Sequence, residues 1–298
     1  MLTVYPSEVP IASFHSLMLG AVAPRPIAFA STIDRHGQPN LSPYSFFNAF
    51  GSNPPTLVFS PSRRVRDNTT KHTFENLYEH AEVVINIVDH KMVEQMSLAS
   101  TEYEKGVNEF VKAGFTEVAS TLVRPPRVGE APAAFECKVR RIVPLGNEGG
   151  AGNLIVAEIV AAHYHNRILD KEGEIDPRKL DAVARMGGNW YCRANGEALF
   201  EIPKPLRNKG MGIDALPKQV RESPFLTGNN LGRLGNVEHL PLEEEVKAFS
   251  QNPQFIQLKM QHKQHPAAFR ETLHLWAQQA LQQGDTAMAF LILLQPGA

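Results

Sequence analysis

Short apolar runs rich in β-prone residues, separated by turn residues, dominate positions 1–200 of the chain. Clusters of Gly, Pro, Asn and Asp between the runs indicate turns. The predicted strands cover residues 27–33, 41–50, 56–60, 83–88, 133–143 and 154–164. Apolar residues at helical spacing predict helices at 71–79 and 91–99. Because a doubly wound parallel sheet needs helices at regular intervals, the pattern favours a barrel of mainly β structure.

Proline and glycine residues cluster just after residue 200. The cluster consists of Pro203, Pro205, Gly210, Gly212 and Pro217. Such a cluster is typical of a linker. We therefore expect one domain at residues 1–204 and a C-terminal extension at 205–298.

The extension has a partly helical pattern, which is clearest at residues 242–249 and 266–283. In the second stretch four side chains share one face at helical spacing, namely Phe269, Leu273, Trp276 and Ala280. We expect these helices to pack on the barrel or to extend a dimer. Residues 228–235 are rich in glycine but lack the Lys-Ser/Thr pair of a phosphate loop, so we interpret them as turns.

The overall charge excludes some classes of partner. The chain of 298 residues has a formal net charge of −1, so no global field would gather nucleic acid or an anionic membrane. Its two cysteines, Cys137 and Cys192, are too few for a disulfide framework. The N-terminus also lacks the pattern of a signal peptide. We therefore expect a reduced, cytoplasmic protein with no nucleic-acid or membrane partner.

The loop at residues 63–71 departs from this neutrality. Its cationic residues are Arg63, Arg64, Arg66 and Lys71. Asp67 is the single acid among them, so the local formal charge is 4 − 1 = +3. The loop leads into the predicted helix at 71–79, whose first N–H groups have no intrahelical partner and attract a phosphate. The alternative is a solvated loop whose threonines cap the helix.

The segment at residues 44–48 precedes this loop and mixes aromatic with polar side chains. In a strand, alternate residues face opposite sides, so one set could pack inward while Ser45 and Asn48 line a ligand. A flat aromatic ring needs this mixture of hydrogen-bonding groups and apolar walls. The alternative is an ordinary strand whose aromatic residues fill the core. The spacing of the two segments favours a pocket for a flat ring that carries a phosphate.

Further motifs follow these segments in a recognisable order. The full set is Pro24-Arg25-Pro26-Ile27, Ser45-Phe46-Phe47-Asn48, Pro54-Pro55, the basic loop with Lys71-His72-Thr73, Asn86-Ile87-Val88, His163-Tyr164-His165 and Arg185-Met186-Gly187-Gly188-Asn189-Trp190-Tyr191. This order resembles the flavin reductase-like family, in its flavoredoxin-like branch. The resemblance implies a six-stranded antiparallel FMN-binding split barrel with inserted helices. It also implies a homodimer with FMN near the subunit interface.

The resemblance further implies which residues hold FMN. Those along the isoalloxazine ring and ribityl chain are Tyr44, Ser45, Phe46, Phe47, Asn48 and Ala49. Those around the phosphate are Ser60, Ser62, Arg63, Arg64, Lys71 and Thr73. No catalytic side chain is predicted, because the flavin itself transfers electrons. His163 and His165 have a spacing that metal ligands use, but no third ligand accompanies them, so no metal site is predicted.

The implied activity is that of an FMN-dependent oxidoreductase. Electrons would pass from NAD(P)H or a protein donor through FMN to flavin, ferric complexes or another small-molecule acceptor. Many relatives that use NAD(P)H carry Gly-Asp before a late strand, followed by His or another aromatic residue, where this chain reads Gly152-Asn153-Leu154. That departure weakens the expectation of a nicotinamide donor. Two alternatives stay open: a non-catalytic flavin- or haem-binding barrel, and a pyridoxamine-phosphate-oxidase-like enzyme.

Overall fold

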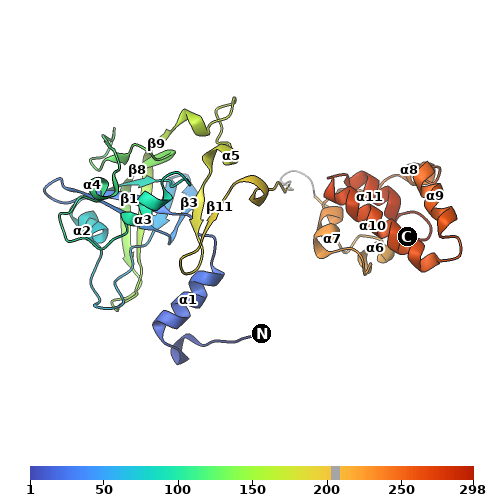
Figure 1. The fold of residues 1–298 in the computed structure, drawn as a ribbon, viewed down its shortest axis with the longest axis horizontal. Coiled ribbons are helices and arrows are strands. Elements are labelled where there is room, and N and C mark those ends of the chain that lie inside the picture. Colours follow the sequence, from blue (N-terminus) through green and yellow to red (C-terminus); the bar gives the residue numbers. More distant parts are fainter. Residues whose placement is uncertain (203–208) are drawn as a thin grey trace. The chain divides into compact units, whose positions relative to one another are not determined.

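The computed structural model describes residues 1–202 and 209–298, which divide into two compact units (Figure 1). The units are Met1–Phe200 and Glu201–Ala298. The boundary expected between residues 204 and 205 lies outside the described residues, as do Pro203 and Pro205 of the expected linker.

The first unit combines strands with short helices. Its strands are β1 (Ala28–Ile33), β2 (Pro39–Tyr44), β3 (Phe47–Ser52), β4 (Pro55–Phe59), β5 (Glu82–Asn86), β6 (Glu117–Val118), β7 (Arg127–Val128), β8 (Ala133–Pro144), β9 (Asn153–Tyr164), β10 (Val183–Arg185) and β11 (Tyr191–Arg193). Its helices are η1 (Pro6–Glu8), α1 (Ile11–Ala21), α2 (His72–Glu79), α3 (Val93–Leu98), α4 (Glu109–Ala113), η2 (Asn166–Ile168), α5 (Pro177–Leu180) and η3 (Gly196–Ala198).

Seven strands of the described chain form one antiparallel sheet in the order β2-β1-β5-β8-β9-β4-β3. The prediction of six strands is wrong, because the expected strand at residues 41–50 is two strands, β2 and β3. These two lie at opposite edges of the sheet, although only Ser45 and Phe46 separate them. Since so short a connection spans only about 10 Å, the two edges must approach each other. The sheet is therefore curled into a barrel.

Apolar side chains fill both faces of this curled sheet. The barrel core collects residues from six strands and α2, among them Ala30, Phe59, Leu77 and Ile155. On the other face of β1, Phe29 packs with residues of and beside α3 and α4, and its ring centroid lies 5.3 Å from that of Phe115. Because every residue of β1 is buried, this strand is the central element that joins the two cores.

A buried carboxylate ties a surface loop to the sheet. Glu136 of β8 is fully buried and accepts N–H bonds from Thr121 (2.7 Å) and Leu122 (2.6 Å). It also accepts a bond from Val123 and contacts His163 Nε2 at 2.7 Å. Burial alone would raise the pKa of Glu136, but these donors outweigh it and lower the pKa. Glu136 is therefore a charged, fully bonded anchor.

The second unit is helical. Its helices are α6 (Lys218–Arg221), α7 (Gly228–Gly235), α8 (Glu243–Phe249), α9 (Pro253–Gln261), α10 (Pro266–Gln282) and α11 (Thr286–Leu293). The helices predicted at 242–249 and 266–283 are present as α8 and α10. The predicted stripe of α10 is confirmed: Phe269, Leu273 and Ala280 are buried in the core of this unit, and Trp276 packs against that core.

The interpretation of residues 228–235 as turns is wrong, because they form α7. Thr227 and Asn230 form a reciprocal capping box at its start, in which each side chain accepts the other residue's backbone N–H. Leu234 is fully buried in the core of the unit. Capping and burial together offset the low helix propensity of the glycines, each of which destabilises a helix by about 1 kcal/mol relative to alanine.

The described residues contain no helix that combines the length and apolar character of a membrane span. Within the same residues, no three His, Cys, Asp or Glu side chains lie close enough together to hold a metal ion.

Replacing the buried anchor tests this account of the sheet. Glu136→Gln puts an amide group among N–H donors, so we expect a loss of about 2 kcal/mol in the free energy of unfolding at pH 7, measured by urea denaturation. Because folding lowers the pKa of Glu136, its contribution is complete above the unfolded pKa near 4.3 and is lost as the pH falls further. The difference between variant and wild type should therefore shrink below about pH 4.

Glu158→Gln is the matched control, since Glu158 pairs with Arg140 at the surface, where its loss should cost under about 1 kcal/mol. Equal losses for the two variants, or a Glu136 difference that persists at pH 3, would contradict the anchor role.

Candidate functional site

The two-residue connection between β2 and β3 brings residues 44–48 close to the basic loop at residues 63–71. The carbonyl of Phe46 accepts the N–H of Ser60, 2.9 Å away, at the start of the basic loop. Tyr44, Arg64, Lys71 and Thr73 line one polar cavity of about 30 Å³. That volume holds little more than a water, so a larger ligand of these residues would have to lie outside the cavity.

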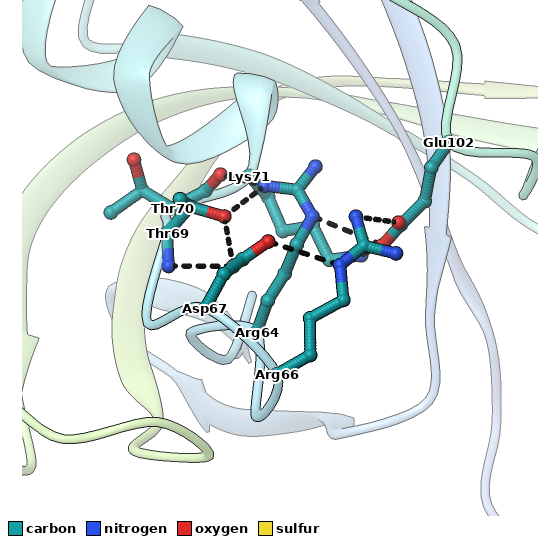
Figure 2. A network of polar contacts seen from close by, with 7 residues as sticks. All are labelled: Arg64, Arg66, Asp67, Thr69, Thr70, Lys71 and Glu102. Carbon is teal, nitrogen blue, oxygen red and sulfur yellow. Dashed lines mark hydrogen bonds and ion pairs between the residues drawn. The ribbon is translucent and has the colours of Figure 1, made fainter.

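Three cations of the basic loop converge on one carboxylate, that of Glu102, which comes from the segment between α3 and α4 (Figure 2). Arg64 Nε and Lys71 Nζ each lie 3.0 Å from Glu102 Oε1. Arg66 Nη2 lies 2.6 Å from Glu102 Oε2. Bonds from Lys71 and Arg64 lower the pKa of Glu102 to about 2. The carboxylate is therefore charged at neutral pH.

Arg63 holds the loop in shape, as Arg64 also does through its bonds to Thr69 Oγ1 and to the carbonyl of Thr70. The Arg63 guanidinium donates to the side-chain oxygen and to the carbonyl of Asn68, both at 2.6 Å. Asn68 has a φ of 56°, in the left-handed region, where the chain reverses. Arg63 therefore braces the turn of the loop, and the cations that gather at its mouth are Arg64, Arg66 and Lys71.

The threonines beside the loop already have partners. Thr69 donates its hydroxyl to Asp67 at 2.6 Å, and Thr70 donates to Glu75 at 2.8 Å. Thr73, in the first turn of α2, is buried and accepts a bond from the Asn40 amide. Lys71 stands immediately before α2 in an extended conformation, so the first N–H groups of the helix open beside the cations.

The 44–48 segment is not the single strand that its alternation predicts. Tyr44 ends β2 and is buried, with its ring 5.6 Å from that of Phe59. Phe47 packs against the same barrel core from the other edge. Asn48 and Ala49 lie exposed on the edge strand β3. The segment thus turns at Ser45 and Phe46, and its polar groups open outward.

Arg25, which sequence reasoning placed only within a motif, holds this turn. Its buried guanidinium donates to the carbonyls of Leu19 (2.6 Å) and Met186 (2.7 Å) and to that of Val22. Its Nε lies 3.5 Å from Ser45 Oγ. Burial, followed by the nearby Arg185, lowers the pKa of Arg25. Arg25 therefore joins the end of α1 and the turn at Met186 to residues 44–48, which we call the ring segment.

Ser60 and Asn153 fix the start of the basic loop to β9. The Ser60 hydroxyl accepts the Asn153 N–H, and the Asn153 amide donates to the carbonyl of Pro61, both at 2.9 Å. Asn153 is buried. Its side chain therefore supports the fold of the loop.

Structural partners account for both histidines of the expected pair. His163 contacts the anchor Glu136, and His165 Nδ1 accepts the N–H of Arg167. Glu102 is the main residue of the site that sequence reasoning missed. Arg66 was noticed only as part of the basic loop. No periodicity links Glu102 to the loop, because the contact is made between two irregular segments.

Residues 19–178 match the family model "Flavin reductase like domain". The chain belongs to the flavin reductase-like family. Nitrilotriacetate monooxygenase component B from Bacillus cereus superposes with a TM-score of 0.63 and 30% identity, over 68% of this chain and 98% of that one. For Pseudomonas fluorescens 2-nitrobenzoate 2-nitroreductase NbaA the TM-score is 0.59 and the identity 29%, over 70% and 100% of the two chains.

A third solved structure shares the fold. It is a split barrel domain protein from Shewanella frigidimarina NCIMB 400, with a TM-score of 0.56 and 25% identity over 66% of this chain and 95% of that one. The family and the split-barrel fold expected from the sequence are thereby confirmed, with seven strands in the sheet. The family also assigns the chain to the flavin-related oxidoreductases. The family match ends at residue 178, before the helical unit at Glu201–Ala298.

Proposed function

We propose that this oxidoreductase binds FMN, with its phosphate at the mouth of the basic loop and its ring along residues 44–49. The observation that carries the proposal is the convergence of Arg64, Arg66 and Lys71 beside the start of α2. A phosphate monoester carries up to two negative charges and suits arginine forks, a lysine and free helix N–H groups. In a chain of net charge −1, such a local cluster supports the proposal of an anionic ligand at this loop.

The ring segment fits the other half of FMN. Ser45 and Phe46 stand at the turn, next to the hydrogen bond that joins the turn to the basic loop. Asn48 offers an exposed amide on the edge strand β3, and the exposed Ala49 lies beside it. Tyr44 and Phe47 face the barrel core and would support the ring from below. Ser60, Ser62, Arg63 and Thr73 complete the proposed set, with Arg63 and Ser60 acting by holding the loop in shape.

Bound FMN would supply the electron transfer, and the protein would position it and exclude unproductive orientations. We propose NAD(P)H or a protein as the electron donor, and flavin, a ferric complex or another small molecule as the acceptor. The Asn153 amide donates to the carbonyl of Pro61 and so supports the loop. The electron donor and the electron acceptor in this proposal rest on the family.

We also propose that the protein acts as a homodimer through α1 and the turn at 186–190. Helix α1 contains no buried residue, and Ile11, Leu17 and Met18 expose 62%, 51% and 37% of their surface. Beside it lies an open hollow of about 630 Å³, with Trp190 on its wall and 76% exposed. An apolar surface of this kind is typical of an interface, and the symmetric partner is a second copy of the chain.

Titration with FMN tests the cofactor. The protein mixed with one equivalent of FMN should remain yellow after gel filtration, and its flavin absorbance should bleach when NADH or NADPH is added without oxygen. Full occupancy without reduction by either nucleotide would point to a protein donor or to a non-catalytic flavin-binding module. Failure to bind FMN would contradict the proposed function.

Removing a cation tests where the phosphate lies. Lys71→Ala and Arg64→Ala should each weaken FMN by about 1.5 to 3 kcal/mol, roughly ten- to hundredfold, and leave riboflavin affinity almost unchanged. Affinities would be read from flavin fluorescence. Lys105→Ala is the control, since Lys105 pairs with Glu75 outside the cluster. Equal losses for FMN and riboflavin would place the phosphate elsewhere.

Light scattering tests the dimer. The wild-type mass should be twice the 33.0 kDa of one chain. Leu17→Glu places a charge on the exposed face of α1 and should shift the mass toward one chain, because a buried unpaired charge is costly. Leu122→Glu, at another exposed leucine, should leave the mass unchanged. A monomeric wild type would refute the interface.

A further inference from the structure

The carboxylate of Glu102 makes the contacts that an anionic ligand of the basic loop would make. Among the described residues, its ion pairs go to Arg64, Arg66 and Lys71, the three cations that gather at the mouth of the loop (Figure 2). Its two oxygens divide these cations between them, two on Oε1 and one on Oε2. A phosphate bound at the same place would need the same donors.

The position of Glu102 also allows its side chain to move away from the three cations. Its side chain is 36% exposed and lies on an irregular segment between α3 and α4. Among the described contacts, its carboxylate bonds are to side-chain cations, and no backbone N–H donates to it. Glu136, by contrast, is buried and held by three backbone N–H groups. The Glu102 contact is therefore an exchangeable one.

We propose that Glu102 is an internal competitor of the phosphate and sets the charge that a ligand needs to occupy the loop. Without ligand, Glu102 and Asp67 reduce the charge of the three cations from +3 to 3 − 2 = +1. A neutral flavin cannot displace the carboxylate, and a singly charged group gains little by doing so. A phosphate monoester, with up to two charges and three acceptor oxygens, exchanges favourably. This inference rests on the proposed FMN site and adds a residue that controls its specificity.

Removing the charge of Glu102 distinguishes a competitor from a residue that positions the cations. Glu102→Gln should tighten FMN roughly tenfold, since about 1.4 kcal/mol of surface ion pairing no longer has to be broken. Riboflavin affinity should not change. The thermal midpoint of the ligand-free variant should fall, because three cations lose a counter-charge, while the rise in midpoint on adding FMN should grow.

Glu104→Gln is the matched control. It makes the same charge change on the same segment, at an exposed side chain with no ion pair among the described residues. FMN affinity in this variant should stay within about twofold of the wild type, as exposed unpaired charges act weakly. If Glu104→Gln tightened FMN as much as Glu102→Gln does, long-range charge and not contact would be responsible, and the inference would fail.

Weaker or unchanged FMN binding in Glu102→Gln would also overturn the inference and make Glu102 a positioning residue. Inorganic phosphate separates this result from failure of the proposed function. With phosphate alone, the midpoint of Glu102→Gln should rise more than that of the wild type, whether or not a flavin binds. No extra rise would overturn the competition, while a wild type that binds phosphate but no FMN would overturn only the assignment of the cofactor.

Discussion

The short connection at Ser45 and Phe46 is the constraint on which the rest of the structure depends. It joins β2 to β3, which lie at opposite edges of the sheet, so the sheet has to curl into a barrel. The same connection places the Phe46 carbonyl against Ser60, and thus sets the ring segment beside the basic loop. Arg25 then pins the turn to the end of α1 and to Met186. This short connection therefore determines both the closure of the barrel and the position of the candidate site.

Positive charge is concentrated beside this connection, in the basic loop. The whole chain is almost neutral, yet three cations meet at the start of α2, where the helix adds its own attraction for anions. Left alone, they would repel one another and collect any small anion. Glu102 and Asp67 reduce this charge without burying it. In the proposed exchange, Glu102 keeps the three cations paired before FMN binds and gives way to its phosphate.

The sequence predicted those parts of the fold that local patterns determine. Strands such as β1 and β9 follow from their short apolar runs between turn residues, and the stripe on α10 follows from its helical spacing. The break at Ser45 and Phe46 escaped detection because a single Ser between aromatic residues is a weak turn signal. The pairing of β2 and β3 with distant strands is what reveals the break. Arg63 and Arg64 look alike in the sequence. In the structure Arg63 donates to Asn68, whereas Arg64 pairs with Glu102. Such choices depend on tertiary contacts between irregular segments, which no spacing rule describes.

A crystal structure of the protein with FMN tests the central claim most directly. The phosphate should lie within hydrogen-bonding distance of Arg64 and Lys71 beside the first turn of α2, with the ring along residues 44–49 and the Glu102 carboxylate turned away from the cations. An FMN phosphate bound away from the basic loop, or a Glu102 carboxylate still paired with Lys71 and Arg64 beside bound FMN, would contradict it.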